Sequence, residues 1–180
     1  MVVYHCYSVF RYAVWQMGNL PDLWDFLLIC VILPCLTAIY TYTLNAYTDK
    51  DIDLINKPER PLPQNKISQR TVISVSIFAL ILDLVLIFVY LNPVQQLIFL
   101  IAILFSAGYS LKPISMKAHG IAANFAIAVG YILCPFLLGY TQYNSILNIP
   151  LRDAVILILL FFQTFGACAS KDLSDLPGDR

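Results

Sequence analysis

Long apolar stretches separated by short polar segments dominate the pattern of this sequence. Five stretches, at residues 23–44, 71–91, 94–109, 120–140 and 151–170, are nearly devoid of charge. A helix needs about 20 apolar residues to cross the roughly 30 Å hydrocarbon core of a bilayer. Alternating segments of about ten residues, which mark membrane β-barrels, do not recur. The pattern therefore predicts an all-α polytopic membrane protein, a transmembrane helix bundle in which residues 1–180 form one domain.

The composition excludes a water-soluble globular domain. Of the 180 residues, 59% are hydrophobic and 12% are charged, which is about half the usual charged share. The formal net charge is zero, and no basic stripe of the kind that binds nucleic acid is present. Membrane lipid is therefore an expected partner, and nucleic acid is not.

The connections between the apolar stretches differ in charge. If each stretch crosses the membrane once, nine of the eleven Lys and Arg residues lie on one face. By the positive-inside rule we expect a multi-pass protein of the cell membrane with this face in the cytoplasm. The segments expected there are Asn45–Arg70, Ser110–His119 and Lys171–Arg180. Seven of the eleven acids share that face, which the positive-inside rule does not require.

The acids on this face form two clusters with helical spacing. Asn45, Asp49 and Asp53 are four residues apart, so they line one face of a helix over two turns. A second stripe forms if the last helix continues through Pro177 and Gly178. Its members are Asp172, Asp175 and Asp179.

Carboxylates stacked along a helix repel one another, and a divalent cation between them removes this repulsion. Mg²⁺ prefers oxygen ligands and is often shared with substrate phosphates. The alternative is that both clusters are solvated helix ends. Two clusters on one face favour a site for Mg²⁺ and a diphosphate, where Arg60, Lys112 and Lys117 could neutralise phosphate oxygens.

Asp83 is a separate case, because it lies in the middle of the second apolar stretch. An ionised group there is costly to insert. The sequence leaves open whether Asp83 is protonated, is paired inside the bundle or lines a cavity.

Three segments together resemble the UbiA-type intramembrane prenyltransferases. N-x3-D-x3-D followed by "INKPERPLP" resembles the first aspartate motif of that family, and "KDLSDLPGDR" resembles the second. Between them, "GYSLKPISMKAHGIAANF" resembles the tyrosine–lysine loop and the helix after it. The resemblance covers roughly residues 23–180. It implies a helix bundle around a central cavity and Mg²⁺-dependent transfer of a prenyl group from a prenyl diphosphate to a lipophilic acceptor, in quinone, lipid or tetrapyrrole biosynthesis.

The resemblance also implies roles for individual residues. The implied Mg²⁺ ligands are Asn45, Asp49, Asp53, Asp172, Asp175 and Asp179, of which Asp49, Asp53, Asp175 and Asp179 are the implied catalytic residues. The implied diphosphate ligands are Arg60, Lys117, Lys112 and Tyr109. Ala46 and Pro177 depart from the family pattern. The Tyr-x3-Lys spacing is also not met, so Lys117 is preferred to Lys112.

Two other classes of membrane protein also place acids in or near apolar helices. A CDP-alcohol phosphotransferase also uses intramembrane aspartates, but its Asp-Gly and Ala-Arg signature is missing from this sequence. A cation-binding transporter would place its acids near the bilayer midplane, whereas only Asp83 lies deep in an apolar stretch here.

The family bundle has nine spans and five or six are visible, so we expect this chain to be the N-terminal portion of a longer enzyme and to be inactive alone.

Overall fold

The computed structural model describes the backbone of residues 2–16, 18, 20 and 22–175, and the side chains of residues 4, 7–16, 18, 20 and 22–168. The described chain is helical and contains no strand. In chain order the helices are α1 Val2–Gln16, α2 Leu23–Leu27, η1 Leu28–Ile32, α3 Leu33–Thr48, α4 Lys50–Asn56, α5 Gln69–Tyr90, α6 Pro93–Ser110, η2 Met116–Ala118, α7 Gly120–Ala128, η3 Val129–Leu133, α8 Cys134–Thr141, η4 Ile146–Asn148 and α9 Leu151–Asp175.

Five helical segments are long and apolar enough to cross a membrane. They are Leu23–Thr48, Gln69–Tyr90, Pro93–Ser110, Gly120–Thr141 and Leu151–Cys168. The all-α membrane fold predicted from hydropathy is therefore confirmed. The first segment runs to Thr48 instead of residue 44 because the helix continues into the polar stripe.

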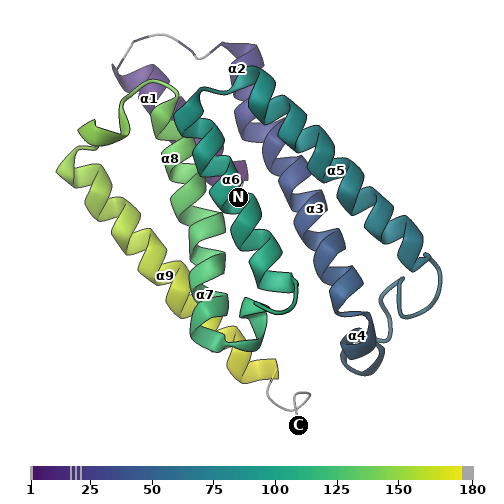
Figure 1. The fold of residues 1–180 in the computed structure, drawn as a ribbon. Coiled ribbons are helices and arrows are strands. Elements are labelled where there is room, and N and C mark those ends of the chain that lie inside the picture. Colours follow the sequence, from purple (N-terminus) through teal and green to yellow (C-terminus); the bar gives the residue numbers. More distant parts are fainter. Residues whose placement is uncertain (1, 17, 19, 21, 176–180) are drawn as a thin grey trace.

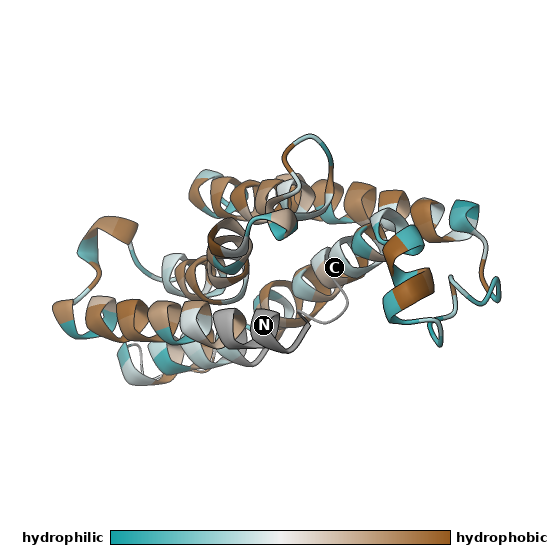
Figure 2. Ribbon diagram, turned by 90° about the horizontal axis from the view of Figure 1, so that it is seen from below, coloured by the Kyte–Doolittle hydropathy of each residue, from teal (hydrophilic) through white to brown (hydrophobic). Residues whose placement is uncertain are grey.

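The bundle is built from neighbouring helix pairs. α3 packs along α5, α7 packs on α9, and α1 packs on α8, while α6 contacts both α3 and α8 (Figure 1). Buried side chains at these contacts include Leu33, Ile87, Phe99 and Leu138. Figure 2 shows the helices largely in the colour of hydrophobic residues, with hydrophilic residues prominent in the linker between α4 and α5.

The turn between α5 and α6 is short because its sequence caps the next helix. The Asn92 side chain accepts hydrogen bonds from the backbone N–H groups of Val94 and Gln95, and the Gln95 side chain accepts one from the backbone N–H of Asn92. Pro93 occupies the first helical turn, where a missing N–H costs nothing. Capping in this way lets α5 and α6 lie antiparallel after a turn of two residues.

Two spans contain a π-helical turn that ends two residues before a buried proline. η1 precedes Pro34, and η3 precedes Pro135. Proline has no N–H to give to the preceding turn and its ring clashes with the carbonyl four residues earlier. A π-helical turn absorbs this disruption within a continuous helix. Both prolines line the cavity described below.

The polar connections gather at one end of the bundle, which we call the polar end (residues 45–70 and 110–120). In Figure 1 the end of α3, α4, the linker between α6 and α7, and the C-terminal end of α9 all lie at the bottom. α2, the turn between α5 and α6, and the loop between α8 and α9 lie at the top. The arrangement brings together segments that are more than 60 residues apart in sequence, such as Thr48 and Lys117, whose side chains are hydrogen-bonded.

At the opposite end, an ionic cluster ties α1 to α9. Asp153 is 2% exposed and accepts hydrogen bonds from Arg11 Nη2 at 3.1 Å, from the Tyr12 hydroxyl and from Arg152 Nε at 3.3 Å. Both guanidinium groups also lie over the Trp15 ring. Burial and the neighbouring Asp153 carboxylate raise the pKa of the Tyr12 phenol. Arg11 and Arg152 therefore share one buried counter-ion.

This cluster predicts a stability difference. Asp153→Asn removes the shared charge and leaves Arg11 without its counter-ion, so the free energy of unfolding should fall by about 3 kcal/mol. Arg152→Gln, at a side chain that is 54% exposed, should cost less than about 1 kcal/mol. Unfolding in detergent followed by circular dichroism measures both variants. Equal stability of the two variants would show that the Asp153 contacts do not hold α1 in place.

Candidate functional site

A cavity of about 480 Å³ lies between α3, α6 and the continuous helix formed by α7, η3 and α8. Ligand sites in proteins commonly enclose about 300–1,000 Å³. The wall is apolar at Pro34, Phe99 and Leu138 and becomes charged toward the polar end. Such a cavity suits a ligand that is apolar along most of its length and strongly polar at one end.

The first acidic stripe keeps its register although the helix changes there. α3 ends at Thr48 and α4 begins at Lys50, with Asp49 between them at φ −97° and ψ 5°. Backbone hydrogen bonds nevertheless run from Asp49 N to Asn45 O at 2.9 Å and from Asp53 N to Asp49 O at 2.7 Å. Asn45, Asp49 and Asp53 therefore stay on one face, and all three line the cavity. Asp51, which the sequence places on the other side, is exposed.

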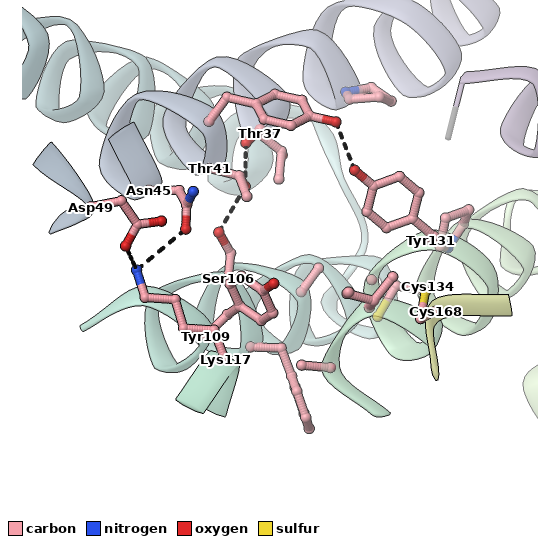
Figure 3. A pocket seen from close by; sticks show the side chains of 18 of the residues that line it. Thr37, Thr41, Asn45, Asp49, Ser106, Tyr109, Lys117, Tyr131, Cys134 and Cys168 are labelled. Carbon is pink, nitrogen blue, oxygen red and sulfur yellow. Dashed lines mark hydrogen bonds and ion pairs between the residues drawn. The ribbon is translucent and has the colours of Figure 1, made fainter. Parts of the chain in front are cut away.

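Each carboxylate of this stripe is paired with a cation of the same chain. Lys117 Nζ forms an ion pair with Asp49 and donates to Thr48 Oγ1 at 2.8 Å and Asn45 Oδ1 at 3.4 Å (Figure 3). Arg60 Nη1 lies 2.6 Å from Asp53 Oδ2. Within each pair, the positive charge of the cation neutralises the negative charge of the carboxylate. The pair with Arg60 explains how Asp53 is accommodated at 5% exposure.

Of the other two predicted diphosphate ligands, Tyr109 and Lys112, one lines the cavity and the other does not. Tyr109 lines the cavity, as does Lys57, a cation not among the predicted ligands. Lys112 is exposed and is not part of the cavity wall. The structure therefore brings Lys117, Arg60 and Tyr109 together and leaves Lys112 outside.

The second acidic cluster is described only in part. Asp172 and Asp175 belong to α9, but their side chains, and Asp179 altogether, lie outside the described residues. Cys168 of the same helix lines the cavity. Among the described side chains, no group of three or more His, Cys, Asp or Glu residues is placed to hold a metal. The predicted set of six ligands is thus described for Asn45, Asp49 and Asp53 alone.

Nearly the whole sequence matches one protein family. Residues 5–180 match the UbiA prenyltransferase family. The chain belongs to this family. The resemblance inferred from the two acidic motifs is confirmed, and UbiA membership together with the five apolar helices makes the chain an integral membrane protein.

Curated UbiA relatives with several different names are similar to this chain. It is 34% identical to chloroplastic chlorophyll synthase of Oryza sativa subsp. japonica, over 85% of this chain and 42% of that protein. It is 32% identical to a 2-acylphloroglucinol 4-prenyltransferase of Humulus lupulus, over 80% and 36% respectively. It is 28% identical to the digeranylgeranylglyceryl phosphate synthase of Korarchaeum cryptofilum, over 86% and 52%. The chain therefore spans about half or less of the length of these relatives. No solved structure is significantly similar to it.

Several cavity residues were not predicted from the sequence. Tyr42 and Tyr131 join α3 to η3 through hydroxyl groups 2.8 Å apart, and both line the cavity. Thr37, Thr41 and Ser106 add hydroxyl groups deeper in the wall. The available signal was spacing, because Thr41 and Thr37 continue the stripe of Asn45 backwards in steps of four.

Asp83 is hydrogen-bonded inside the bundle. It is 0% exposed, and Thr37 Oγ1 donates a hydrogen bond to Asp83 Oδ2 at 2.6 Å. Asp83 Oδ1 has no hydrogen-bond partner within the described part of the chain. Asp83 is not part of the cavity wall, but Thr37 is. The acid therefore lies behind a wall residue and fixes its hydroxyl group.

Proposed function

We propose that the protein containing this chain transfers a prenyl group from a prenyl diphosphate to a lipophilic acceptor within the membrane, in a Mg²⁺-dependent reaction. One observation carries this proposal: a chain of the UbiA prenyltransferase family encloses a cavity that is apolar inside and lined by Asp49, Asp53, Lys117 and Arg60 at its polar end. A diphosphate joined to a long apolar chain has the same division of polarity.

The cations of the polar end are suited to hold the diphosphate. The side chains of Lys117 and Arg60 are 19% and 39% exposed, so both remain accessible from the cavity. Arg can bind phosphate through two parallel N–H groups, and Lys acts as a point charge. On binding, these cations would turn from the carboxylates to the phosphate oxygens, which carry more negative charge. Lys57 lies in the same wall and would add a third positive charge.

The carboxylates released by this exchange fit Mg²⁺. Asp49, Asp53 and the Asn45 amide oxygen supply hard oxygen donors on one helical face. In a continuous helix, positions 172 and 175 share a face with position 168, and Cys168 lines the cavity. We propose that Asp172, Asp175 and Asp179 complete the set from that side. Bound Mg²⁺ would stabilise the negative charge of the diphosphate as it leaves.

The apolar part of the cavity has its own role in this reaction. Cleavage of the allylic C–O bond leaves a carbocation that water would capture unless it is excluded. Phe99, Phe105 and Tyr109 line the cavity and offer ring faces, which attract cations. Tyr40, Tyr47 and Phe125 do not line it.

Release of diphosphate from a prenyl diphosphate tests the proposed function. The full-length protein in lipid, supplied with geranylgeranyl diphosphate and Mg²⁺, should release diphosphate and form a prenylated product with a suitable lipophilic acceptor, and EDTA should stop both. A cation transporter would release none, and a CDP-alcohol phosphotransferase would instead release CMP from a CDP-alcohol. The proposal would be overturned if no diphosphate were released with any acceptor of a panel, whether or not CMP was released from a CDP-alcohol.

The orientation of the polar end is a further expected result. The excess of cations there predicts that it faces the cytoplasm in a cell membrane. In a background without the native cysteines, Glu59→Cys should react with an impermeant maleimide only after the membrane is opened. Leu147→Cys, at the opposite end and 89% exposed, should react in intact cells. The reverse pattern would contradict the orientation.

A further inference from the structure

The polar stripe of α3 continues past the charged site into the apolar part of the cavity. Thr41 and Thr37 precede Asn45 in steps of four residues, and both line the cavity together with Ser106 of α6. One helical turn separates successive members, so Thr41 lies about 6 Å deeper along the helix than Asn45. The wall around them is apolar, with Pro34, Phe99 and Ala102. Hydroxyl groups therefore extend from the charged site into the apolar part of the cavity.

The hydrogen bonds of these three hydroxyl groups fix which atoms remain for a ligand. Thr37 Oγ1 donates to Asp83 Oδ2 at 2.6 Å, and Thr41 Oγ1 donates to the Thr37 carbonyl at 2.7 Å. Thr41 and Ser106 Oγ lie 2.7 Å apart. Because the single hydrogen of Thr41 goes to the carbonyl, Ser106 must be the donor of this bond (Figure 3). All three hydroxyl hydrogens are thus used inside the protein, while Thr37 Oγ1 and Ser106 Oγ accept none of these hydrogen bonds and keep lone pairs for a ligand.

A purely structural explanation accounts for part of this pattern. Threonine in a membrane helix often donates to the carbonyl one turn earlier. Thr43 does this, donating to the Ile39 carbonyl at 2.6 Å, and does not line the cavity. Thr37 differs from Thr43, because its hydrogen is taken by a fully buried acid on α5. Ser106 differs as well, because its bond crosses from α6 to α3 beside the cavity.

We propose that Thr37, Thr41 and Ser106 form the binding site for the polar group of the acceptor, and that this group is the O–H of a lipophilic alcohol or phenol. A ligand hydroxyl would donate its hydrogen to Ser106 Oγ, whose own hydrogen is held by Thr41 Oγ1, so that a lone pair of Ser106 is free to accept. The acceptor would then lie one turn deeper than the diphosphate, beside the apolar prenyl chain. This inference rests on the proposed function for its place in the reaction, but the binding it describes is independent of Mg²⁺ and diphosphate.

The test compares two probes that differ by the donor hydrogen, 4-hexylphenol and its methyl ether 4-hexylanisole. The full-length protein in nanodiscs, without metal or diphosphate, is titrated with each probe by saturation-transfer NMR, and empty nanodiscs are subtracted. The measured quantity is the ratio of the two dissociation constants. The loss of one buried hydrogen bond predicts that the phenol binds about five to ten times more tightly.

Matched variants decide whether these hydroxyl groups cause the tighter binding of the phenol. Ser106→Ala and Thr41→Val should reduce the ratio to about one, whereas Ser106→Thr, which keeps the hydroxyl, and Thr43→Val, on the same helix, should retain it. An unchanged ratio in Ser106→Ala and Thr41→Val would overturn the proposal, and so would an equal loss in Thr43→Val. Because no transfer is measured, a failure of the proposed function would appear separately, as the absence of diphosphate release.

Discussion

Replacing Asp49 with asparagine is expected to lower prenyl transfer on the order of a hundredfold or more, while the protein stays folded. Asp49 lines the cavity and is one of two described carboxylates on the proposed Mg²⁺ face. An amide keeps the shape but removes the negative charge that holds the ion. Losses of this order follow when one electrostatic contact to a developing charge is removed. Turnover with geranylgeranyl diphosphate, measured at saturating Mg²⁺, tests the prediction.

Asp51→Asn is the matched control for this variant. Asp51 lies two residues away in α4 and is exposed outside the cavity wall, so its loss should change turnover less than about twofold. Near-normal turnover of Asp49→Asn would refute the proposed metal face. The sequence predicts the same large loss for Asp175→Asn, whose side chain lies outside the described residues.

The second large effect is expected at Lys117. Lys117→Met removes the cation that bonds Asp49 and Asn45 at the polar end, and with it a proposed contact to the diphosphate. Truncating one partner of a hydrogen-bonded charge pair costs about 2 kcal/mol or more, so the affinity for a prenyl thiodiphosphate analogue should fall about 30-fold. Isothermal titration calorimetry with the full-length protein measures this affinity in the presence of Mg²⁺.

Lys112→Met provides the control within the same linker. Lys112 is five residues from Lys117 but exposed outside the cavity wall, so its loss should leave the affinity nearly unchanged. If Lys112→Met weakened binding as much as Lys117→Met, a general effect of positive charge at the polar end would explain the result. The specific assignment of Lys117 would then be wrong.

The fold was largely predictable because membrane insertion constrains sequence strongly. Every backbone N–H in hydrocarbon must be paired, so a long apolar stretch has few structures open to it, and all five predicted stretches are helices. The alignment of Asn45, Asp49 and Asp53 was predictable for a similar reason. Helical spacing of four residues is a local property, and the backbone hydrogen bonds across Asp49 preserve it.

The features that sequence reasoning missed depend on contacts between distant segments. The preference for Lys117 over Lys112 came from the family resemblance, because spacing alone could not show that Lys117 reaches Asp49, 68 residues away. The linker between α6 and α7 decides which lysine faces the cavity. Residues 1–18 lie outside the five predicted stretches. α1 nevertheless forms, and the contacts of Arg11 and Tyr12 with Asp153, more than 140 residues away, hold it on the bundle.

The cavity itself was also beyond the sequence pattern. Its wall includes Pro34 and Pro135, each of which follows a π-helical turn, and these prolines lie on different helices that are far apart in the sequence. A proline signals a disturbed helix, but it does not say how the disturbance is absorbed. Thr37 and Thr41 were hidden among apolar neighbours, although their spacing from Asn45 could have marked them as members of the same stripe.

An experimental structure of the full-length protein with Mg²⁺ and geranylgeranyl thiodiphosphate, an analogue that resists cleavage, tests the central claim most directly. The account predicts the diphosphate at the polar end, with phosphate oxygens bonded to Lys117 and Arg60. It also predicts that Asp49 and Asp53 have exchanged these cations for metal ions and that the apolar chain lies in the cavity beside Phe99. A diphosphate bound elsewhere, with the Asp49–Lys117 and Asp53–Arg60 pairs intact, would contradict it.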